Sequence, residues 1–301
     1  MKRAEIDSFS IATHENIVNP TPALSLNRLH LLTWGLAFGL TDVGPVRATN
    51  EDNFLIDEAL QLLMVADGMG GHAAGAVASA ATLVAVREYL QRAAVGATTF
   101  AVDHLTPPAL LQRDPDSTQS DPNTDAVALL TQAVRFANTE LHAQSLANRA
   151  LRGMGTTLTG LWRSPDDEAV LVFHVGDSRL YRYRAGALSQ LTHDQTLYQQ
   201  ALDMGAIENL PARNFLLQAV GPAPDVTPEV RALRVLPGDV LMLCSDGLHG
   251  SVPHGDIEQT LADASAATLA QASARLIALA KEYGVRDNIT VLLVWCSDAG
   301  A

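Results

Sequence analysis

Short apolar runs separated by turn residues occupy most of the second half of the chain. Runs of this kind, rich in branched, leucine and aromatic side chains, are typical of β-strands. They cover residues 156–162, 168–176, 180–184, 187–192, 230–236, 239–245 and 289–296. In the first half, residues 31–42 predict one further strand, and residues 53–67 predict a β-hairpin with its turn near Asp57 and Glu58.

Apolar residues recur at helical spacing in other segments. The segment 73–92 is rich in alanine and offers Val77, Leu83, Val84 and Leu90 for burial. Three further helices are expected over 125–149, 194–205 and 266–283. Because strands and helices do not alternate regularly, the pattern favours a mixed α+β sandwich with its helices outside.

Two segments differ from this pattern. Residues 1–30 have no clear period and predict an N-terminal extension, and residues 106–124, rich in Pro, Asp, Ser and Thr, predict a loop insertion. No internal repeat is visible, so residues 31–301 are expected to form a single domain.

The acidic composition narrows the classes of partner. A formal net charge of −13 would repel phosphate backbones, so neither nucleic acid nor an anionic membrane is an expected partner. Cys244 and Cys296 lie inside β-type runs, which indicates no disulfide framework and fits a reducing compartment. The longest unbroken apolar run, 291–296, is far shorter than the ~20 residues of a spanning helix. The first 20 residues lack the apolar core of a signal peptide, so a cytoplasmic protein is expected.

The segment "VADGMGGHAAG" (65–75) allows two interpretations. Gly68, Gly70 and Ala73 match the G-x-G-x-x-A fingerprint of dinucleotide-binding proteins. However, the acidic residue at about the expected spacing, Glu88, lies inside a predicted helix, and no β–α–β series follows. Asp67 would also place a carboxylate beside the pyrophosphate. A nucleotide-dependent oxidoreductase therefore rests on this fingerprint alone.

Carboxylates stand at the ends of five predicted strands, which favours a metal site. A single Asp-Gly pair indicates only a turn, but five acidic clusters packed together would repel one another unless hard divalent cations lay between them. No His or Cys spacing suits zinc, so Mg²⁺ or Mn²⁺ is expected. The clusters are centred on Asp67, Asp177, Asp246, Asp287 and the run Asn50–Asp52.

The order of these motifs resembles that of the metal-dependent Ser/Thr protein phosphatases, the PPM or type 2C family, in its compact bacterial form. The resemblance extends from about Thr41 to Val294 and rests on "TDVGPVRATNEDNF", "VADGMGGHAAG", "MGTTLTG", "HVGDSRLYRYR", "LTHDQT", "GDVLMLCSDGL" and "RDNITVLLV". It implies a four-layer α/β/β/α sandwich of two antiparallel sheets, with a metal centre between the sheets at one end.

The resemblance also implies roles for the acidic residues. Asp67 would bridge two Mn²⁺ or Mg²⁺ ions, with the Gly68 carbonyl as a further ligand of one of them. Asp246 and Asp287 would complete the shell of the first ion. Glu51 and Asp52 would hold the second ion directly or through water, and Asp177 would take part in a third, looser site.

The chemistry implied by the family is hydrolysis in which a hydroxide that bridges the two metals attacks phosphorus in line, without a covalent phosphoenzyme. Arg47, five residues before Asp52, matches the arginine that grips the phosphate. His72 could protonate the leaving oxygen or cap the following helix, and the two interpretations stay open. The catalytic candidates are therefore Arg47, Asp52 and His72. Arg182 and Arg184 are expected on one solvated strand face.

The expected function is removal of phosphate from phosphoserine and phosphothreonine in proteins, in opposition to a Ser/Thr kinase. Residues 195–218 occupy the place of the family's flap and are expected to influence the choice of protein substrate. The alternative is a catalytically inactive relative that serves as a phospho-binding module or scaffold. Such relatives typically lose metal-site carboxylates, whereas Asp67, Asp246 and Asp287 are all present.

Overall fold

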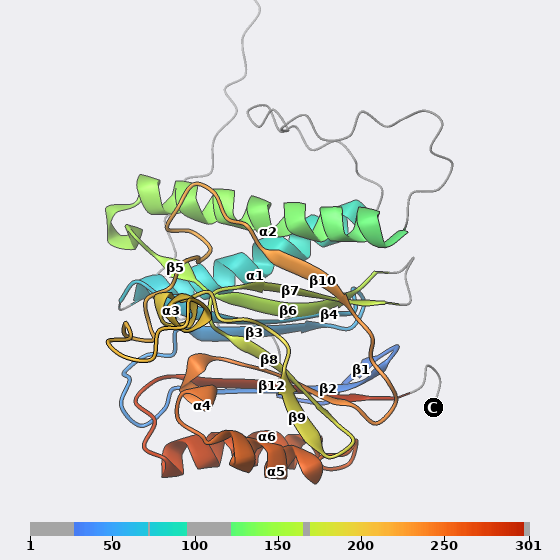
Figure 1. Ribbon diagram of the computed structural model, residues 1–301. Coiled ribbons are helices and arrows are strands. Elements are labelled where there is room, and N and C mark those ends of the chain that lie inside the picture. Colours follow the sequence, from blue (N-terminus) through green and yellow to red (C-terminus); the bar gives the residue numbers. More distant parts are fainter. Residues whose placement is uncertain (1–26, 72, 95–121, 165–168, 298–301) are drawn as a thin grey trace, which may run out of the picture.

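A computed structural model describes residues 27–71, 73–94, 122–164 and 169–297 of the chain. Two β-sheets lie face to face in the middle of the molecule, and helices cover the outer face of each (Figure 1). All the strand pairs in the two sheets are antiparallel. The expected four-layer α/β/β/α sandwich is thus confirmed.

The first sheet has the strand order β1-β2-β12-β11-β8-β9. Its strands are β1 (His30–Leu32), β2 (Gly35–Asp42), β8 (Arg179–Arg184), β9 (Ala187–Gln190), β11 (Val240–Cys244) and β12 (Ile289–Cys296). Helices α5 (His254–Ala262) and α6 (Leu269–Glu282) cover its outer face, and the short α4 (Asp246–His249) follows β11 directly.

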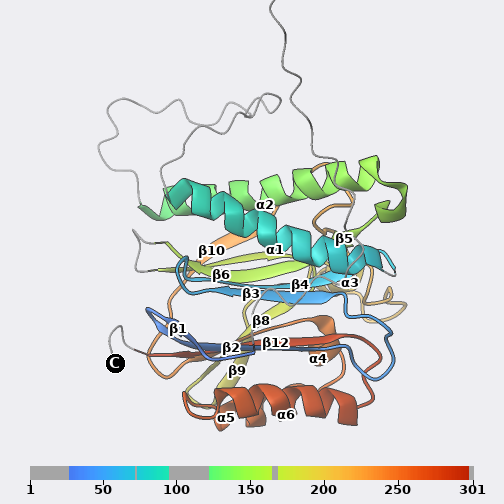
Figure 2. The ribbon, with the colours of Figure 1, turned by 180° about the vertical axis from the view of Figure 1, so that it is seen from behind.

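The second sheet has the order β10-β7-β6-β4-β3, with β5 paired to β4. Its strands are β3 (Asp52–Asp57), β4 (Leu62–Met69), β5 (Gly155–Thr156), β6 (Leu158–Arg163), β7 (Val170–Val175) and β10 (Glu229–Leu233). The long helices α1 (Ala73–Ala94) and α2 (Pro122–Ala147) cover it, as the view from behind also shows (Figure 2). A 3-10 turn (Arg149–Leu151) follows α2, and α3 (Leu197–Asp203) lies between β9 and β10 in the chain.

Three apolar layers hold the sandwich together, and β12 shows why its sequence is an unbroken apolar run. Ile289, Val291 and Leu293 face α5 and α6, whereas Leu292 and Val294 belong to the core between the sheets. Because side chains alternate along a strand, burial on both faces removes the usual alternation of polar and apolar residues.

Some element boundaries differ from the sequence predictions. Residues 31–42 form two strands and not one, because the chain turns at Thr33 and Trp34 so that Leu32 pairs with Gly35. Trp34 is buried in this turn, so the apolar pattern hides the reversal. Helix α5 was not predicted, and α3 is shorter than expected. Residues 122–124 of the predicted loop insertion begin α2, and 106–121 lie outside the described residues.

The predicted N-terminal extension, 1–30, lies mostly outside the described residues, and its last residue, His30, begins β1. Within the described part of the chain, no helix combines the length and apolar character needed to cross a membrane.

Candidate metal centre

Antiparallel pairing of β3 with β4 sets two carboxylates side by side. In this register Asp52 is the direct partner of Asp67. Like charges opposite each other on neighbouring strands destabilise a sheet, and Asp52 is only 3% exposed. The pairing therefore costs folding free energy unless protons or cations compensate the charge.

Three more carboxylates reach the same end of the sandwich from separate segments. Asp246 opens α4 just beyond β11, Asp287 precedes β12, and Asp177 follows β7. This is the end that carries α4, on the left in Figure 1. Asp246 lies close enough to Asp67 for each carboxyl group to shift the pKa of the other. The five predicted clusters thus converge in three dimensions.

Burial and mutual repulsion favour the neutral forms of this cluster. Desolvation raises the pKa of Asp52 to about 7, and the charges of Asp246 and Asp287 add to the shift. Desolvation also raises the pKa of Asp177 to about 7, with Asp246 as the next cause. The pKa of Asp67 lies well above its ordinary value, first through burial and then through Asp52 and Asp246. Bound cations would reverse these shifts, because they favour the ionised carboxylates.

Asp52 is held by the opposite sheet. Ser245 Oγ and Thr290 Oγ1 donate to its Oδ2 atom at 2.7 and 2.8 Å, and Ser245 Oγ in turn accepts from the Thr290 amide at 3.0 Å. Two charge-assisted hydrogen bonds orient one carboxylate oxygen. Ser245 and Thr290 were not singled out from the sequence, although each lies within three residues of a predicted acidic ligand.

The backbone of Asp67 is fixed by two threonines. Thr157 Oγ1 accepts from the Asp67 amide at 2.9 Å, and Thr156 Oγ1 donates to the Asp67 carbonyl at 2.8 Å. Both threonines are buried on or beside β5. They position Asp67 through its main chain.

A glycine of α1 makes room for two oxygen donors. A Cβ atom placed on Gly75 would lie 2.8 Å from Glu51 Oε2 and 2.8 Å from the Gly68 carbonyl oxygen. The Glu51 carboxylate and the Gly68 carbonyl therefore approach the same point on α1, where no side chain could fit. Two hard oxygen donors around one glycine are suited to Mg²⁺ or Mn²⁺.

Arg47 lies at the open side of the cluster. Its Nη2 atom donates to Asp287 Oδ2 at 2.6 Å, and the two side chains are 48% and 37% exposed. Asn288 fastens the loop that carries Arg47: its Nδ2 donates to the carbonyls of Val43 and Thr49, and its Oδ1 accepts from the Glu51 amide at 2.9 Å. Asn288 was not predicted, and its only signal is its place directly after Asp287.

His249, also missed, lies beside Asp177. Its Nε2 donates to the Asp177 carbonyl at 3.0 Å. Burial lowers the pKa of His249 to about 3, with Arg179 as the next cause, so the ring is neutral and the proton sits on Nε2. Gln195 contacts Gly176, the residue before Asp177: the Gly176 amide donates to Gln195 Oε1 at 3.0 Å. His72 lies outside the described residues.

The donor set fits hard divalent cations. It consists of carboxylates and one carbonyl, with Arg47 as the neighbouring cation. Glu51, Asp52 and Asp177 are each less than a tenth exposed, which is costly for ionised groups without compensating charge. In the described residues, no three acidic, histidine or cysteine side chains already surround a common metal-sized position. The fit therefore rests on the chemistry of the donors and on the space that Gly75 leaves open.

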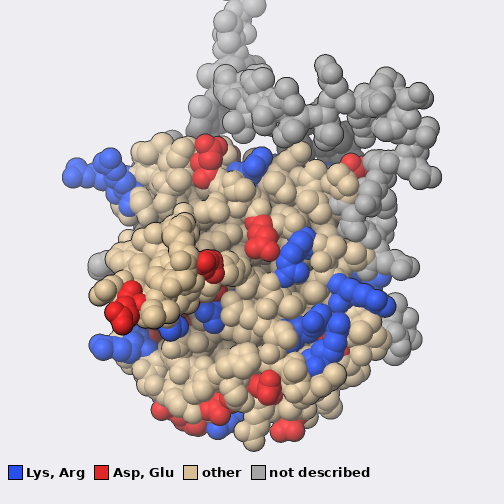
Figure 3. Space-filling model, in the orientation of Figure 1, with Lys and Arg blue, Asp and Glu red and all other residues tan. Residues whose placement is uncertain are grey.

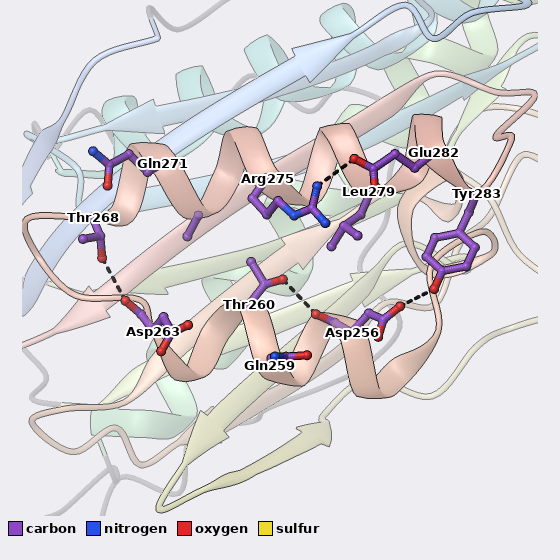
Figure 4. A pocket seen from close by; sticks show the side chains of 11 residues that line it. Asp256, Gln259, Thr260, Asp263, Thr268, Gln271, Arg275, Leu279, Glu282 and Tyr283 are labelled. Atoms are coloured by element: carbon purple, nitrogen blue, oxygen red, sulfur yellow. Dashed lines mark hydrogen bonds and ion pairs between the residues drawn. The ribbon is translucent and has the colours of Figure 1, made fainter.

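A groove between α5 and α6 lies away from the carboxylate cluster. It has a volume of about 590 Å³, and none of its lining residues belongs to that cluster. Its polar groups largely satisfy one another: Arg275 pairs with Glu282 at 2.7 Å, and Tyr283 donates to Asp256 (Figure 4). The candidate metal centre is therefore identified by its cluster of carboxylates and not by this groove.

Comparison with known proteins agrees with this geometry. A family model described as protein phosphatase 2C matches residues 46–292. The serine/threonine phosphatase Stp of Listeria monocytogenes serotype 4b (strain F2365) is 36% identical over 262 residues, 84% of this chain and 93% of that protein. The serine/threonine protein phosphatase PstP of Mycobacterium tuberculosis (strain ATCC 25618 / H37Rv) is 35% identical over 258 residues, 84% of this chain but only 43% of PstP. The chain therefore spans less than half the length of that relative.

A solved structure extends the comparison to metals. The catalytic domain of PstP, in complex with two manganese ions, aligns with a TM-score of 0.68 and 33% identity, covering 87% of this chain and 98% of that one.

Proposed function

The chain belongs to the protein phosphatase 2C family, and from this premise we propose that it is a metal-dependent phosphatase acting on phosphoserine and phosphothreonine in proteins. The observation that carries the proposal is the convergence of five acidic segments at one end of the sandwich, with the half-exposed Arg47 at its open side. A catalytically inactive scaffold would have no need of this charge, which costs folding free energy in the absence of cations.

The first metal position would be formed by Asp67, Asp246 and Asp287. Glu51 and the Gly68 carbonyl would serve the second, because both reach the space left by Gly75. When bound, Mn²⁺ or Mg²⁺ would supply a water of lowered pKa as nucleophile and positive charge for the phosphoryl oxygens. The manganese complex of the PstP domain supports this choice of metal.

Asp52 and Asp177 would support the centre in different ways. One Asp52 oxygen is already held by Ser245 and Thr290, so this residue is suited to orienting a ligand water with its other oxygen. Asp177 would serve a third, looser ion.

Arg47 would bind the phosphate of the substrate. Among the described residues, Asp287 is its hydrogen-bond partner, through Nη2. The remaining N–H groups would bind two phosphate oxygens and stabilise their charge in the transition state. The role of His72 as proton donor to the leaving oxygen stays a prediction.

The flap, residues 195–218, would contact the protein substrate. Leu197 N donates to the Phe215 carbonyl at 2.9 Å and Leu217 N to the Gln195 carbonyl at 2.7 Å, which closes the segment on itself. Three large apolar residues on it, Met204, Ile207 and Phe215, are 55–87% exposed. The expected partners are phosphoproteins and the Ser/Thr kinase that phosphorylates them, in the cytoplasm, where the two buried free cysteines would stay reduced.

An assay on a phosphothreonine peptide, with Mn²⁺ and with EDTA, tests the proposal. Hydrolysis is expected with Mn²⁺ and none with EDTA. Full hydrolysis after removal of all divalent cations would contradict the proposed function.

A further inference from the structure

Arginines from both sheets gather at one open edge of the sandwich, away from the carboxylates. Strand β10 is the edge of one sheet, and β8 and β9 form the edge of the other. Figure 3 shows basic side chains gathered on the right of this face, where Figure 1 places the end of β10 and the connection to β11. The four arginines of this edge cluster are Arg182, Arg184, Arg231 and Arg234.

Three of these side chains point into the space between the sheets. Along β8, Leu180 lies in the core between the sheets, so Arg182 and Arg184 share its face. Along β10, Leu233 lies in the same core, so Arg231 shares its face. Arg231 Nη2 donates across the edge to the Leu191 carbonyl, just beyond β9.

Two of the arginines have carboxylate partners. Arg184 donates through Nε and Nη2 to the buried Asp239 at 2.6 and 2.5 Å, and its Nη2 also reaches the Arg234 carbonyl at 3.1 Å. Arg231 pairs with Glu229 at 3.3 Å. Among the described residues, two carboxylates form ion pairs with these four arginines, which leaves an excess of two positive charges in this part of a protein of net charge −13.

Arg182 is the unusual member. Its Nε atom is inaccessible to solvent and has no hydrogen-bond partner, and no carboxylate of the described residues forms an ion pair with it. The expectation of a solvated Arg182 is therefore wrong at this atom. An unmatched buried donor is costly, and the charge of Arg184, two residues further along the same face of β8, adds repulsion.

We propose that this edge cluster is a binding site for a phosphate-type oxyanion, centred on Arg182. Arg182 is only partly buried, so an oxyanion at this edge would bind its guanidinium, give the donor that now has no partner an acceptor, and offset the excess of positive charge. A planar guanidinium suits two oxygens of one phosphate group. The anion would be free phosphate or a second phosphorylated residue of a protein substrate.

The separation between the edge cluster and the metal centre does not distinguish free phosphate from a second phosphorylated residue, but it suggests a peptide that can test both. Arg182 lies five residues beyond Asp177, so at ~3.3 Å per residue their Cα atoms are at most about 17 Å apart. An extended peptide with two phosphorylated residues five positions apart would span the same length. Such a peptide could place one phosphate at each site.

Binding of inorganic phosphate tests the site without any need for activity. Isothermal titration uses the metal-free Arg47→Ala protein, in which the proposed catalytic phosphate contact is removed. Saturable binding is expected, weakened about tenfold or more by the added change Arg182→Ala, since a charge-assisted bidentate contact is lost. Arg182→Lys should restore it only partly, because an ammonium lacks the fork. The matched control is Arg135→Ala on the exposed face of α2, which should change nothing.

Arg234→Ala provides a second variant, because Arg234 is exposed and its loss leaves the core intact. It should weaken binding severalfold, and thermal unfolding should show a folded protein. Unchanged phosphate affinity in both Arg182→Ala and Arg234→Ala would overturn the site, as would an equal loss in Arg135→Ala. If Arg182→Ala does not fold, Arg234→Ala decides.

Kinetics then distinguish the source of the anion, and this arm alone rests on the proposed function. With Mn²⁺ present, a role in substrate binding predicts that Arg182→Ala raises KM for the doubly phosphorylated peptide and leaves KM for the singly phosphorylated peptide and both kcat values unchanged. Equal KM values in variant and parent would assign the site to free phosphate.

Discussion

Asp52 and Asp67 are direct partners across β3 and β4, and the pKa values of both carboxyl groups are raised by burial and by the negative charges around them. Antiparallel pairing makes this opposition unavoidable once the hairpin forms. The hydroxyls of Ser245 and Thr290 hold only one oxygen of Asp52. The remaining negative charge is what the proposed metal ions would neutralise, and it makes stability without metal sensitive to substitution and to pH.

Asp67→Asn should abolish phosphatase activity and yet stabilise the metal-free protein. The amide keeps the shape of the side chain and removes its repulsion with Asp52 and Asp246. A rise in Tm of about 2–4 °C is expected for each kcal/mol of repulsion relieved. Calorimetry with and without Mn²⁺ measures both effects, since the variant should also lose most of the stabilisation by Mn²⁺.

The matched control is Asp225→Asn, an exposed aspartate outside the cluster, which should leave Tm and activity unchanged. A metal-free Asp67→Asn protein less stable than the parent would contradict the account of repulsion.

The stability of the metal-free protein should fall as pH rises from about 4 to about 7. Asp52 and Asp177 have pKa values of about 7 in the folded protein against an ordinary 3.8, so the folded state binds more protons over this range. The free energy of unfolding therefore decreases by an amount on the order of a few kcal/mol. Urea titrations at a series of pH values measure the slope.

Mn²⁺ should reverse this trend, because it competes with protons for the same carboxylates. The stabilisation by Mn²⁺ is expected to be larger near pH 7.5 than near pH 5. Metal-free stability that increases steadily over this range would show that the carboxylates are not the groups in control.

Gly75→Ala should weaken metal binding although alanine is the better helix former. The new Cβ atom would press on Glu51 Oε2 and the Gly68 carbonyl. Mn²⁺ affinity is expected to fall roughly 10- to 100-fold, which titration calorimetry measures.

Gly255→Ala in α5 provides the control for Gly75→Ala. A Cβ atom on Gly255 meets nothing within 4 Å, so this change should stabilise the protein by up to about 1 kcal/mol and leave Mn²⁺ affinity unchanged. If both alanines leave the affinity unchanged, Glu51 and Gly68 do not form a metal position.

Arg47→Ala should lower kcat/KM by roughly 100-fold, because a donor to the phosphoryl oxygens is lost. Mn²⁺ affinity should not fall, since the change also frees the Asp287 carboxylate from its 2.6 Å ion pair. Arg47→Lys should recover only part of the activity. Steady-state kinetics together with Mn²⁺ titration separate the two effects, and unchanged kinetics would remove Arg47 from the site.

Local sequence patterns were sufficient for the fold class and for most of the acidic site. Asp67, Asp246 and Asp287 are recognisable because each adjoins a long apolar run, and carboxylates at the ends of paired strands must meet at an edge. The α5 helix was missed because its buried positions are few, with Ile257 and Leu261 as its buried residues.

By itself, the sequence determined most of the strands, which carboxylates end them, and that their charge calls for a hard cation. Only the tertiary structure decided that Ser245 and Thr290 grip Asp52, 193 and 238 positions away, that Gly75 opens the space between two donors, and that Arg182 is buried at Nε without a partner. The physical reason is that propensity and periodicity act over neighbouring residues. Charge, burial and steric exclusion depend on what the folded chain brings within a few ångströms, and no local pattern encodes that.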